Sequence, residues 1–201
     1  MSSFANDCAE KALNILVEAQ SETDVFAKQT GIKCREGCGQ CCLRPALEVQ
    51  VVEMLPLAQE LINNGEASSS YDLAAASPDG VCVLYAPESQ DRTKGRCRHY
   101  ALRPGICRLF GFAAVSTKED EHPALASCSW HKQLMPEAVT AAQRNINAGG
   151  NVPLFADYRM RMFALAPTPS YSETLPINRA LMQAIEKLEL LSLQDPDSSG
   201  R

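Results

Sequence analysis

Four cysteines within nine residues constrain this chain more than any other feature of its sequence. They form the motif Cys34-x3-Cys38-x2-Cys41-Cys42, with Gly37 and Gly39 inside it. Glycine adopts backbone angles that other residues resist, so thiolates on such a loop can converge on one centre without large strain. Closely spaced cysteines on loops hold zinc ions and iron–sulfur clusters. The alternative, that these four cysteines are simply small buried apolar residues, does not explain why they lie so close together. The motif therefore predicts an irregular metal-binding loop.

A second group of cysteines follows at wider spacing: Cys82, Cys97, Cys107 and Cys128. Wide gaps alone are weak evidence for metal ligation. Basic residues, however, flank both groups: Lys33, Arg35, Arg44, Arg98, Arg103 and Arg108. Nearby cations lower the pKa of thiols and balance the negative charge of a thiolate site. The alternative is that each of these side chains is a solvated surface residue.

The nine cysteines indicate metal binding more than disulfides. Nine is an odd number, and the adjacent pair Cys41 and Cys42 suits a disulfide framework poorly. Charged residues interrupt the first 20 positions, and no stretch approaches the roughly 18 apolar residues that span a bilayer. We therefore expect a cytoplasmic protein without a membrane partner, in a compartment where thiols stay reduced.

Composition predicts one mainly α domain with a small β-hairpin and irregular cysteine-rich metal-binding loops. The 201 residues are 45% hydrophobic and only 6% aromatic, which suits an aliphatic helical core. The formal charge of −5 gives no basic footprint for binding phosphates, so a nucleic-acid partner is not expected. A protein partner is not indicated.

Apolar periodicity gives a coarse map of the chain. Helices are expected at 5–29, 52–64, 136–146 and 177–191, with Pro176 just inside the start of the last. Short strands are expected at 47–51, 81–85 and 96–100, with a projecting loop at 87–94. A loose connector with at most one or two helical turns is expected at 66–79. We divide the chain into an N-terminal helix (1–29), a cysteine-cluster region (30–132), C-terminal helices packed on it (133–194) and a disordered tail (195–201).

The cysteine motifs resemble those of a known family. The first motif is followed by Cys97-x2-Tyr100-x2-Arg103-Pro104-x2-Cys107-Arg108 and then Phe110. This pair, in this order, is similar to the CxxCxxCC (YkgJ-like) proteins, described as a zinc- or iron-chelating domain, over about residues 30 to 130. The resemblance implies eight metal ligands: Cys34, Cys38, Cys41, Cys42, Cys82, Cys97, Cys107 and Cys128. The chain departs from the family pattern at two places: its first spacing is x3, and it has an insertion at 87–94. The insertion weakens the assignment of Cys82 as a ligand.

Three other residues were weighed as ligands. His131 follows Cys128 by three positions, so a Cys-x2-His pair is geometrically possible, but a surface or partly buried histidine is the preferred interpretation. His99 is not expected to be a ligand. Cys8 falls on the apolar face of the first helix and is expected in the core.

Several functions fit a cysteine cluster. We favour an iron–sulfur cluster over zinc because of the irregular spacing, the cysteine doublet and the flanking cations. A zinc-stapled interaction module is the alternative. The x3–x2 spacing also occurs in radical S-adenosylmethionine enzymes, but the strands of their barrel are missing here. Flagellin lysine methylases share the cysteine domain, yet no methyl-donor site, catalytic triad or phosphate loop is recognisable.

Overall fold

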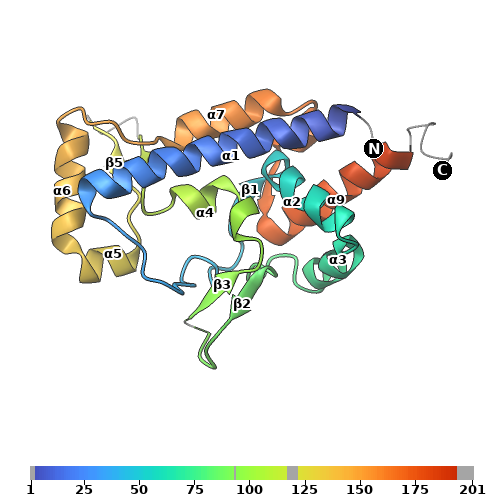
Figure 1. Ribbon diagram of the computed structural model, residues 1–201, viewed down its shortest axis with the longest axis horizontal. Coiled ribbons are helices and arrows are strands. Elements are labelled where there is room, and N and C mark those ends of the chain that lie inside the picture. Colours follow the sequence, from blue (N-terminus) through green and yellow to red (C-terminus); the bar gives the residue numbers. More distant parts are fainter. Residues whose placement is uncertain (1–2, 93, 117–121, 194–201) are drawn as a thin grey trace.

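One long helix, α1 (Ser3–Thr30), organises the part of the chain that the computed structural model describes: residues 3–92, 94–116 and 122–193 (Figure 1). Its apolar stripe is buried, as the spacing predicted, at Cys8, Ala9, Ala12, Leu16, Ala19 and Phe26. The helix ends at Gly31, whose φ of 74° is in the left-handed region that glycine tolerates. The predicted helix 5–29 and the core position of Cys8 are confirmed.

One end of α1 packs against a group of helices near the C-terminus. Strand β1 (Glu48–Gln50) pairs antiparallel with β6 (Thr174–Pro176) and leads through a 3-10 turn, η1 (Val51–Met54), into α2 (Leu55–Asn63). Helix α9 (Ile177–Leu193) packs on α2. The helices predicted at 52–64 and 177–191 are confirmed. Pro176, however, ends β6 and does not lie inside the helix, because its backbone pairs with Glu48.

The predicted loose connector at 66–79 is wrong over most of its length. Residues Ala67–Ala76 form helix α3, which packs on α9. Ala67 and Ala74 are buried, and the Tyr71 hydroxyl donates a hydrogen bond to Glu186 at 2.6 Å. Four alanines favour a helix intrinsically, and small side chains permit close packing, so a weak apolar pattern was enough.

The β-hairpin exists but is displaced from its predicted position. The strands are β2 (Tyr85–Pro87) and β3 (Gly95–Cys97), and they project away from α1 (Figure 1). Residues 81–84, expected as strand, lie outside β2, and residues 100–102 form a 3-10 turn, η2 (Tyr100–Leu102). Pairing places Tyr85 opposite Cys97. Pro87 is tolerated because a strand at the edge of a sheet needs no donor there.

The other end of the molecule holds α5 (Ser129–Leu134) and α6 (Pro136–Asn147), the second of them predicted. Helix α4 (Gly105–Leu109) and helix α7 (Phe155–Leu165) both pack along α1, and α8 (Pro169–Ser172) is a single turn before β6. Strands β4 (Ala114–Val115) and β5 (Ala124–Leu125) form a further two-stranded antiparallel pair. The fold is thus mainly helical with small antiparallel sheets, which confirms the expected fold class.

Two apolar clusters form the core, and the cysteine loop runs between their ends. The larger cluster joins α1, η1, α2, α7 and α9, and the smaller gathers Phe26, Ile32, Ala114, Ala142 and Ile146. No helix among the described residues is both long and apolar enough to cross a membrane. The predicted disordered tail at 195–201 lies outside the described residues, and the division into regions stays a prediction.

Candidate metal centre

A cavity of about 560 Å³ lies between the cysteine loop, the hairpin and helices α1 and α4. Seven of the eight candidate ligands line it: Cys34, Cys38, Cys41, Cys42, Cys82, Cys97 and Cys107. They come from three separate stretches of sequence, which the fold brings together around one space. All nine cysteines are free, and the ninth, Cys8, donates its thiol to the Leu165 carbonyl in the core at 3.7 Å.

Cys128 approaches the same region from the other side, through His131. The backbone N–H of His131 donates to the Cys128 sulfur at 3.3 Å, and His131 Nε2 lies 3.9 Å from the sulfur of Cys34. The preferred interpretation of His131 as a surface or partly buried residue is wrong, because its exposed fraction is 0%. Gly111 makes room for the ring: a Cβ there would lie 2.7 Å from His131 Cε1. Burial lowers the pKa of His131, which keeps the ring neutral.

Burial is the largest effect on the pKa of two thiols on the hairpin side, Cys82 and Cys97, and it raises the pKa of both. Backbone amides act in the opposite direction: those of Leu84 and Tyr85 lower the pKa of Cys82, and that of His99 lowers the pKa of Cys97. Hydrogen bonds to the charged form favour a thiolate and fix the direction of its lone pairs. His99 thus supports a ligand through its backbone, while its ring faces Glu66 at 3.9 Å.

Burial raises the pKa of the thiols in the cavity well above the ordinary value. The pKa is about 11 for Cys34 and Cys82 and about 12 for Cys41 and Cys42. Cys34 is exposed as a whole residue, but its thiol is partly shielded from water, and this desolvation is the main cause of its raised pKa. Neighbouring thiols add to the rise, since two thiolates close together repel. Without metal these groups are protonated at neutral pH, so metal binding must release protons.

Arg103 is the cation that stabilises the thiolate form of the cavity cysteines. It lowers the pKa of four of them: Cys34, Cys42, Cys97 and Cys107. Its guanidinium carbon lies 3.7 Å from the centre of the Tyr100 ring, and Nη2 donates to Gln20 at 2.7 Å. Within the described residues, its buried Nε has no hydrogen-bond partner. A buried donor without a partner is costly, and an acceptor in the cavity would remove that cost.

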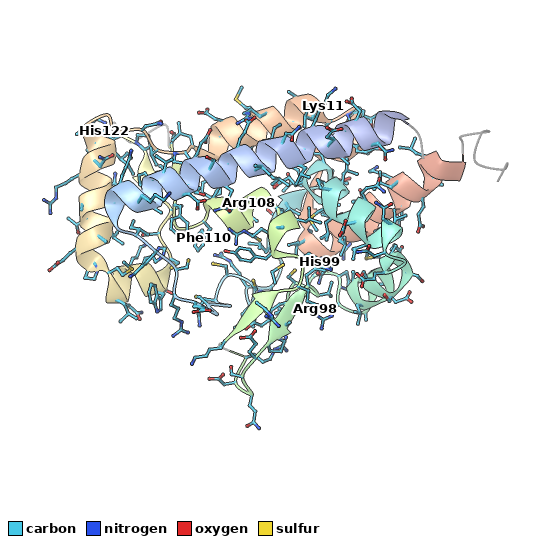
Figure 2. All side chains as sticks on the ribbon, in the orientation of Figure 1. Lys11, Arg98, His99, Arg108, Phe110 and His122 are labelled. Atoms are coloured by element: carbon cyan, nitrogen blue, oxygen red, sulfur yellow. The ribbon has the colours of Figure 1, made fainter. Side chains whose placement is uncertain are left out.

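The other predicted cations have different roles. Arg108 is buried under α1 and donates Nε to the Arg103 carbonyl at 2.9 Å, which braces the turn before α4 (Figure 2). Arg98 is exposed on the segment after β3 (Figure 2), and Lys33, Arg35 and Arg44 are exposed on the cysteine loop. Lys33 and Arg35 border the cavity, but Arg103 is the cation that lowers the pKa of its thiols.

Tyr85 joins the cysteine loop to the hairpin. A Cβ on Gly39 would lie 2.2 Å from the Tyr85 hydroxyl oxygen, and a Cβ on Gly95 would lie 2.5 Å from the same atom. The two glycines therefore let the loop and β3 close on this ring, whose hydroxyl donates to the Arg92 carbonyl at 2.6 Å. The Gly95 amide also donates to the Gly37 carbonyl at 3.1 Å.

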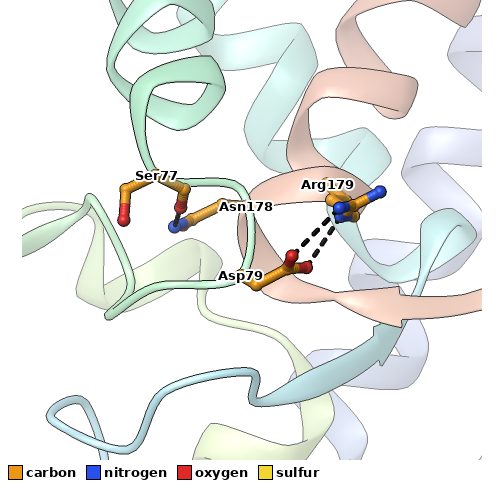
Figure 3. Close-up of polar contacts among 4 residues, drawn as sticks. All are labelled: Ser77, Asp79, Asn178 and Arg179. Carbon is orange, nitrogen blue, oxygen red and sulfur yellow. Dashed lines mark hydrogen bonds and ion pairs between the residues drawn. The ribbon is translucent and has the colours of Figure 1, made fainter.

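Asn178 in α9 positions the segment that carries Cys82. Its Nδ2 donates to the carbonyls of Ser77 (2.7 Å) and Val81 (3.1 Å), and its Oδ1 accepts from the Val83 amide at 3.1 Å. Figure 3 shows the Ser77 contact beside the double ion pair between Arg179 and Asp79. Asn178 is 1% exposed, so these three bonds are shielded from water.

Glu53 positions α4, the helix that carries Cys107. Its carboxylate accepts from the amides of Gln50 (2.9 Å) and Gly105 (2.8 Å) and from the Tyr158 hydroxyl (2.8 Å). Burial raises the pKa of Glu53 despite these donors. Gly105 is required at the start of α4, because a Cβ there would lie 2.1 Å from the Tyr158 ring.

The donor set fits a metal, although the thiols are not yet gathered around one point. Among the described residues, no three His, Cys, Asp or Glu side chains already stand in position to hold a metal ion. The cavity nevertheless offers seven thiols, backbone donors to sulfur, and an unpartnered guanidinium N–H. These are features of sites that hold anionic metal–thiolate groups.

Comparison with known proteins places the chain in a family. Residues 33–139, about half of the chain, match the family model CxxCxxCC, whose description reads "Putative zinc- or iron-chelating domain". The chain belongs to the CxxCxxCC family. No curated protein and no solved structure shows significant similarity to it. The resemblance noted from the motifs is thereby confirmed, and membership of the CxxCxxCC family supports metal binding without deciding between zinc and iron.

Some contributors to this site escaped the sequence analysis. The burial of His131 could not be foreseen, because its neighbours Gly111 and Phe112 are distant in sequence. Asn178 and Glu53 lie in segments that carry no cysteine motif. A polar residue within an apolar helical stripe is the only signal that could have singled them out.

Proposed function

We propose that this CxxCxxCC protein binds iron–sulfur centres through its cysteine thiolates. The observation that carries the proposal is the cavity of about 560 Å³ lined by seven thiols. A single zinc ion draws four sulfurs to about 2.3 Å and needs little space. An iron–sulfur cluster needs thiolate ligands, room for several inorganic atoms, and positive groups that offset its charge. The cavity volume and the position of Arg103 support the cluster over a lone ion.

When bound, such a cluster supplies one-electron redox chemistry. The residues of the chain would ligate it, surround it with apolar side chains and offset its charge through Arg103. Tyr100, stacked on Arg103 and 62% exposed, brings this region close to the surface, where a redox partner can approach. The proposal assumes a reducing compartment, such as the cytoplasm, in which the thiols stay unpaired, and it includes no nucleic-acid or membrane partner.

Anaerobic purification tests the proposal. The protein should be brown, with broad visible absorption, and should contain iron and acid-labile sulfide in similar amounts. Cys38→Ser should lose at least half of that colour, whereas Cys8→Ala should keep all of it, because Cys8 lies in the core away from the cavity. Colourless protein with zinc and no sulfide would show the zinc alternative to be correct.

A further inference from the structure

The eight candidate thiols divide into two sets of neighbours, and the division passes between two adjacent residues. Besides burial, the groups that most raise the pKa of Cys41 are Cys34 and Cys128. The groups that most raise the pKa of its neighbour Cys42 are Cys82 and Cys97. The two thiols of the doublet therefore face different surroundings.

Contacts independent of charge place Cys34 and Cys128 together. The ring of His131 lies 3.9 Å from the Cys34 sulfur, and its own amide donates to Cys128. Phe112 and Trp130 pack edge-on against that ring, which fixes the side of the cavity that faces α5. Cys38 lies between the two sides: its backbone forms a bridge with Lys94 beside the hairpin, and its thiol acts more strongly on the pKa of Cys34 than any other thiol does.

Backbone pairing places the other set together on the hairpin side. Cys97 lies opposite Tyr85 in the hairpin, and the Tyr85 amide bonds back to the Cys82 carbonyl at 3.1 Å. The Arg98 amide donates to the Leu84 carbonyl at 2.9 Å, which extends the contact beyond the strands. Cys107 reaches this set from α4, and the thiols that raise its pKa are Cys82, Cys42 and Cys97.

We propose that the cysteines form two separate four-thiol metal sites. Site A comprises Cys34, Cys38, Cys41 and Cys128, and site B comprises Cys42, Cys82, Cys97 and Cys107. Four thiolates are the full ligand set of a structural zinc ion and also of a cubane iron–sulfur cluster. The inference rests on the proposed function only in that metal is bound, and it holds for either metal.

Arg103 lines the cavity that both sites share, and it lowers the pKa of Cys34 of site A and of three thiols of site B. The single peptide that links Cys41 to Cys42 then joins one ligand of each site. Two centres so connected lie close together, so their occupancy is measured best by stoichiometry, with one ligand removed from each site in turn.

The experiment compares Cys128→Ser, Cys97→Ser and the double variant with the unaltered chain. Both residues are half-buried, so a serine should not by itself prevent folding. Far-UV circular dichroism reports whether each variant folds. We expect each single variant to keep about half of the metal per chain and the double variant to keep almost none. Cys8→Ala is the control and should keep all of it.

Other outcomes overturn the inference. Complete loss of metal in both folded single variants would indicate one shared centre, and full retention in Cys128→Ser would remove Cys128 from the ligands. If a variant does not fold, titration of the unaltered metal-free chain with Co²⁺ decides: two equivalents with thiolate charge-transfer bands support two sites, and one equivalent contradicts them. Zinc in place of iron and sulfide would refute the iron–sulfur proposal, but each single variant should still keep about half of the metal.

Discussion

A single arginine side chain carries most of the electrostatic compensation in the thiol cavity. Arg103 stacks on Tyr100, bonds to Gln20 and leaves its Nε without a partner among the described residues. Its guanidinium lowers the pKa of Cys34, Cys42, Cys97 and Cys107. Its position in the Arg-Pro-Gly turn, directly before α4, fixes it between the cysteine loop and the hairpin.

Replacement of Arg103 by glutamine should make the bound metal more sensitive to acid. Without the cation the pKa of nearby thiols rises, protons compete better for sulfur, and metal is released at a higher pH than in the unaltered chain. Release during stepwise acidification, followed by absorbance or metal analysis, measures the midpoint. Arg98→Gln is the matched control, because Arg98 is exposed. Equal midpoints for both variants would show that Arg103 has no electrostatic role.

At the scale of elements, long amphipathic helices could be predicted and contacts between distant segments could not. Helices α1 and α9 follow from apolar spacing alone, because each buries one continuous stripe, whereas α6 follows from its alanines, Pro136 at its start and the glycines after its end. Strand β1 was located, but its partner β6 lies more than a hundred residues away, and no local signal identifies it. The hairpin shifted because residues 81–84 are held by Asn178 and not by strand pairing.

The same limit applies to the candidate site. The motifs located the thiols, but which thiols are neighbours depends on how the hairpin, α4 and α5 pack around the loop. Buried His131 shows this most clearly: its contact with Cys34 spans 97 residues. Arg35 borders the cavity as an exposed side chain of the loop, whereas Arg103 is held beside the thiols by a turn that proline and glycine impose.

Two neighbouring residues of α9 give a comparison of buried and exposed polar contacts (Figure 3). Asn178→Ala should lower the free energy of unfolding by about 1–3 kcal/mol, because it leaves three partly buried backbone groups, at Ser77, Val81 and Val83, without partners. Arg179→Ala removes a solvent-exposed ion pair with Asp79 and should lower the free energy of unfolding far less. Urea unfolding of the metal-free protein measures both. Equal effects would contradict the role assigned to Asn178.

The Asn178 variant should also weaken site B selectively, since it releases the segment that carries Cys82. Metal content is expected to fall further than in Arg179→Ala at the same pH. This readout separates a loss of overall stability from a loss of ligand position.

Across the whole molecule, the cavity lies where two sets of helices meet, and metal would join them. Glu53 links η1, α4 and α7 from the core side, while the thiols would link the cysteine loop, the hairpin and α5 from the other. Protonated thiols cannot make that second set of links. The protein should therefore respond to pH in opposite directions with and without metal.

For the metal-free protein, stability should fall as pH rises. Folding raises the pKa of Cys34 and Cys82 to about 11 and of Cys41 and Cys42 to about 12, against 9.0 for an unburied thiol. Between these values the unfolded chain loses thiol protons that the folded chain retains, so the contribution present below pH 9 is lost on approaching pH 12. Urea midpoints measured anaerobically with reductant should decline over this range, and less steeply in a Cys41→Ser/Cys42→Ser variant.

For the metal-loaded protein, stability should instead fall on acidification. The ligands must be thiolates, so protons and metal compete for the same sulfur atoms, and each metal released takes up protons. Because burial already favours protonation of these thiols, metal loss should begin at a higher pH than for an exposed four-thiol peptide with the same metal. Unfolding midpoints of loaded and metal-free protein should thus converge as the pH is lowered and diverge above neutrality. Parallel profiles would mean that the thiols of the cavity are not the groups that hold the metal.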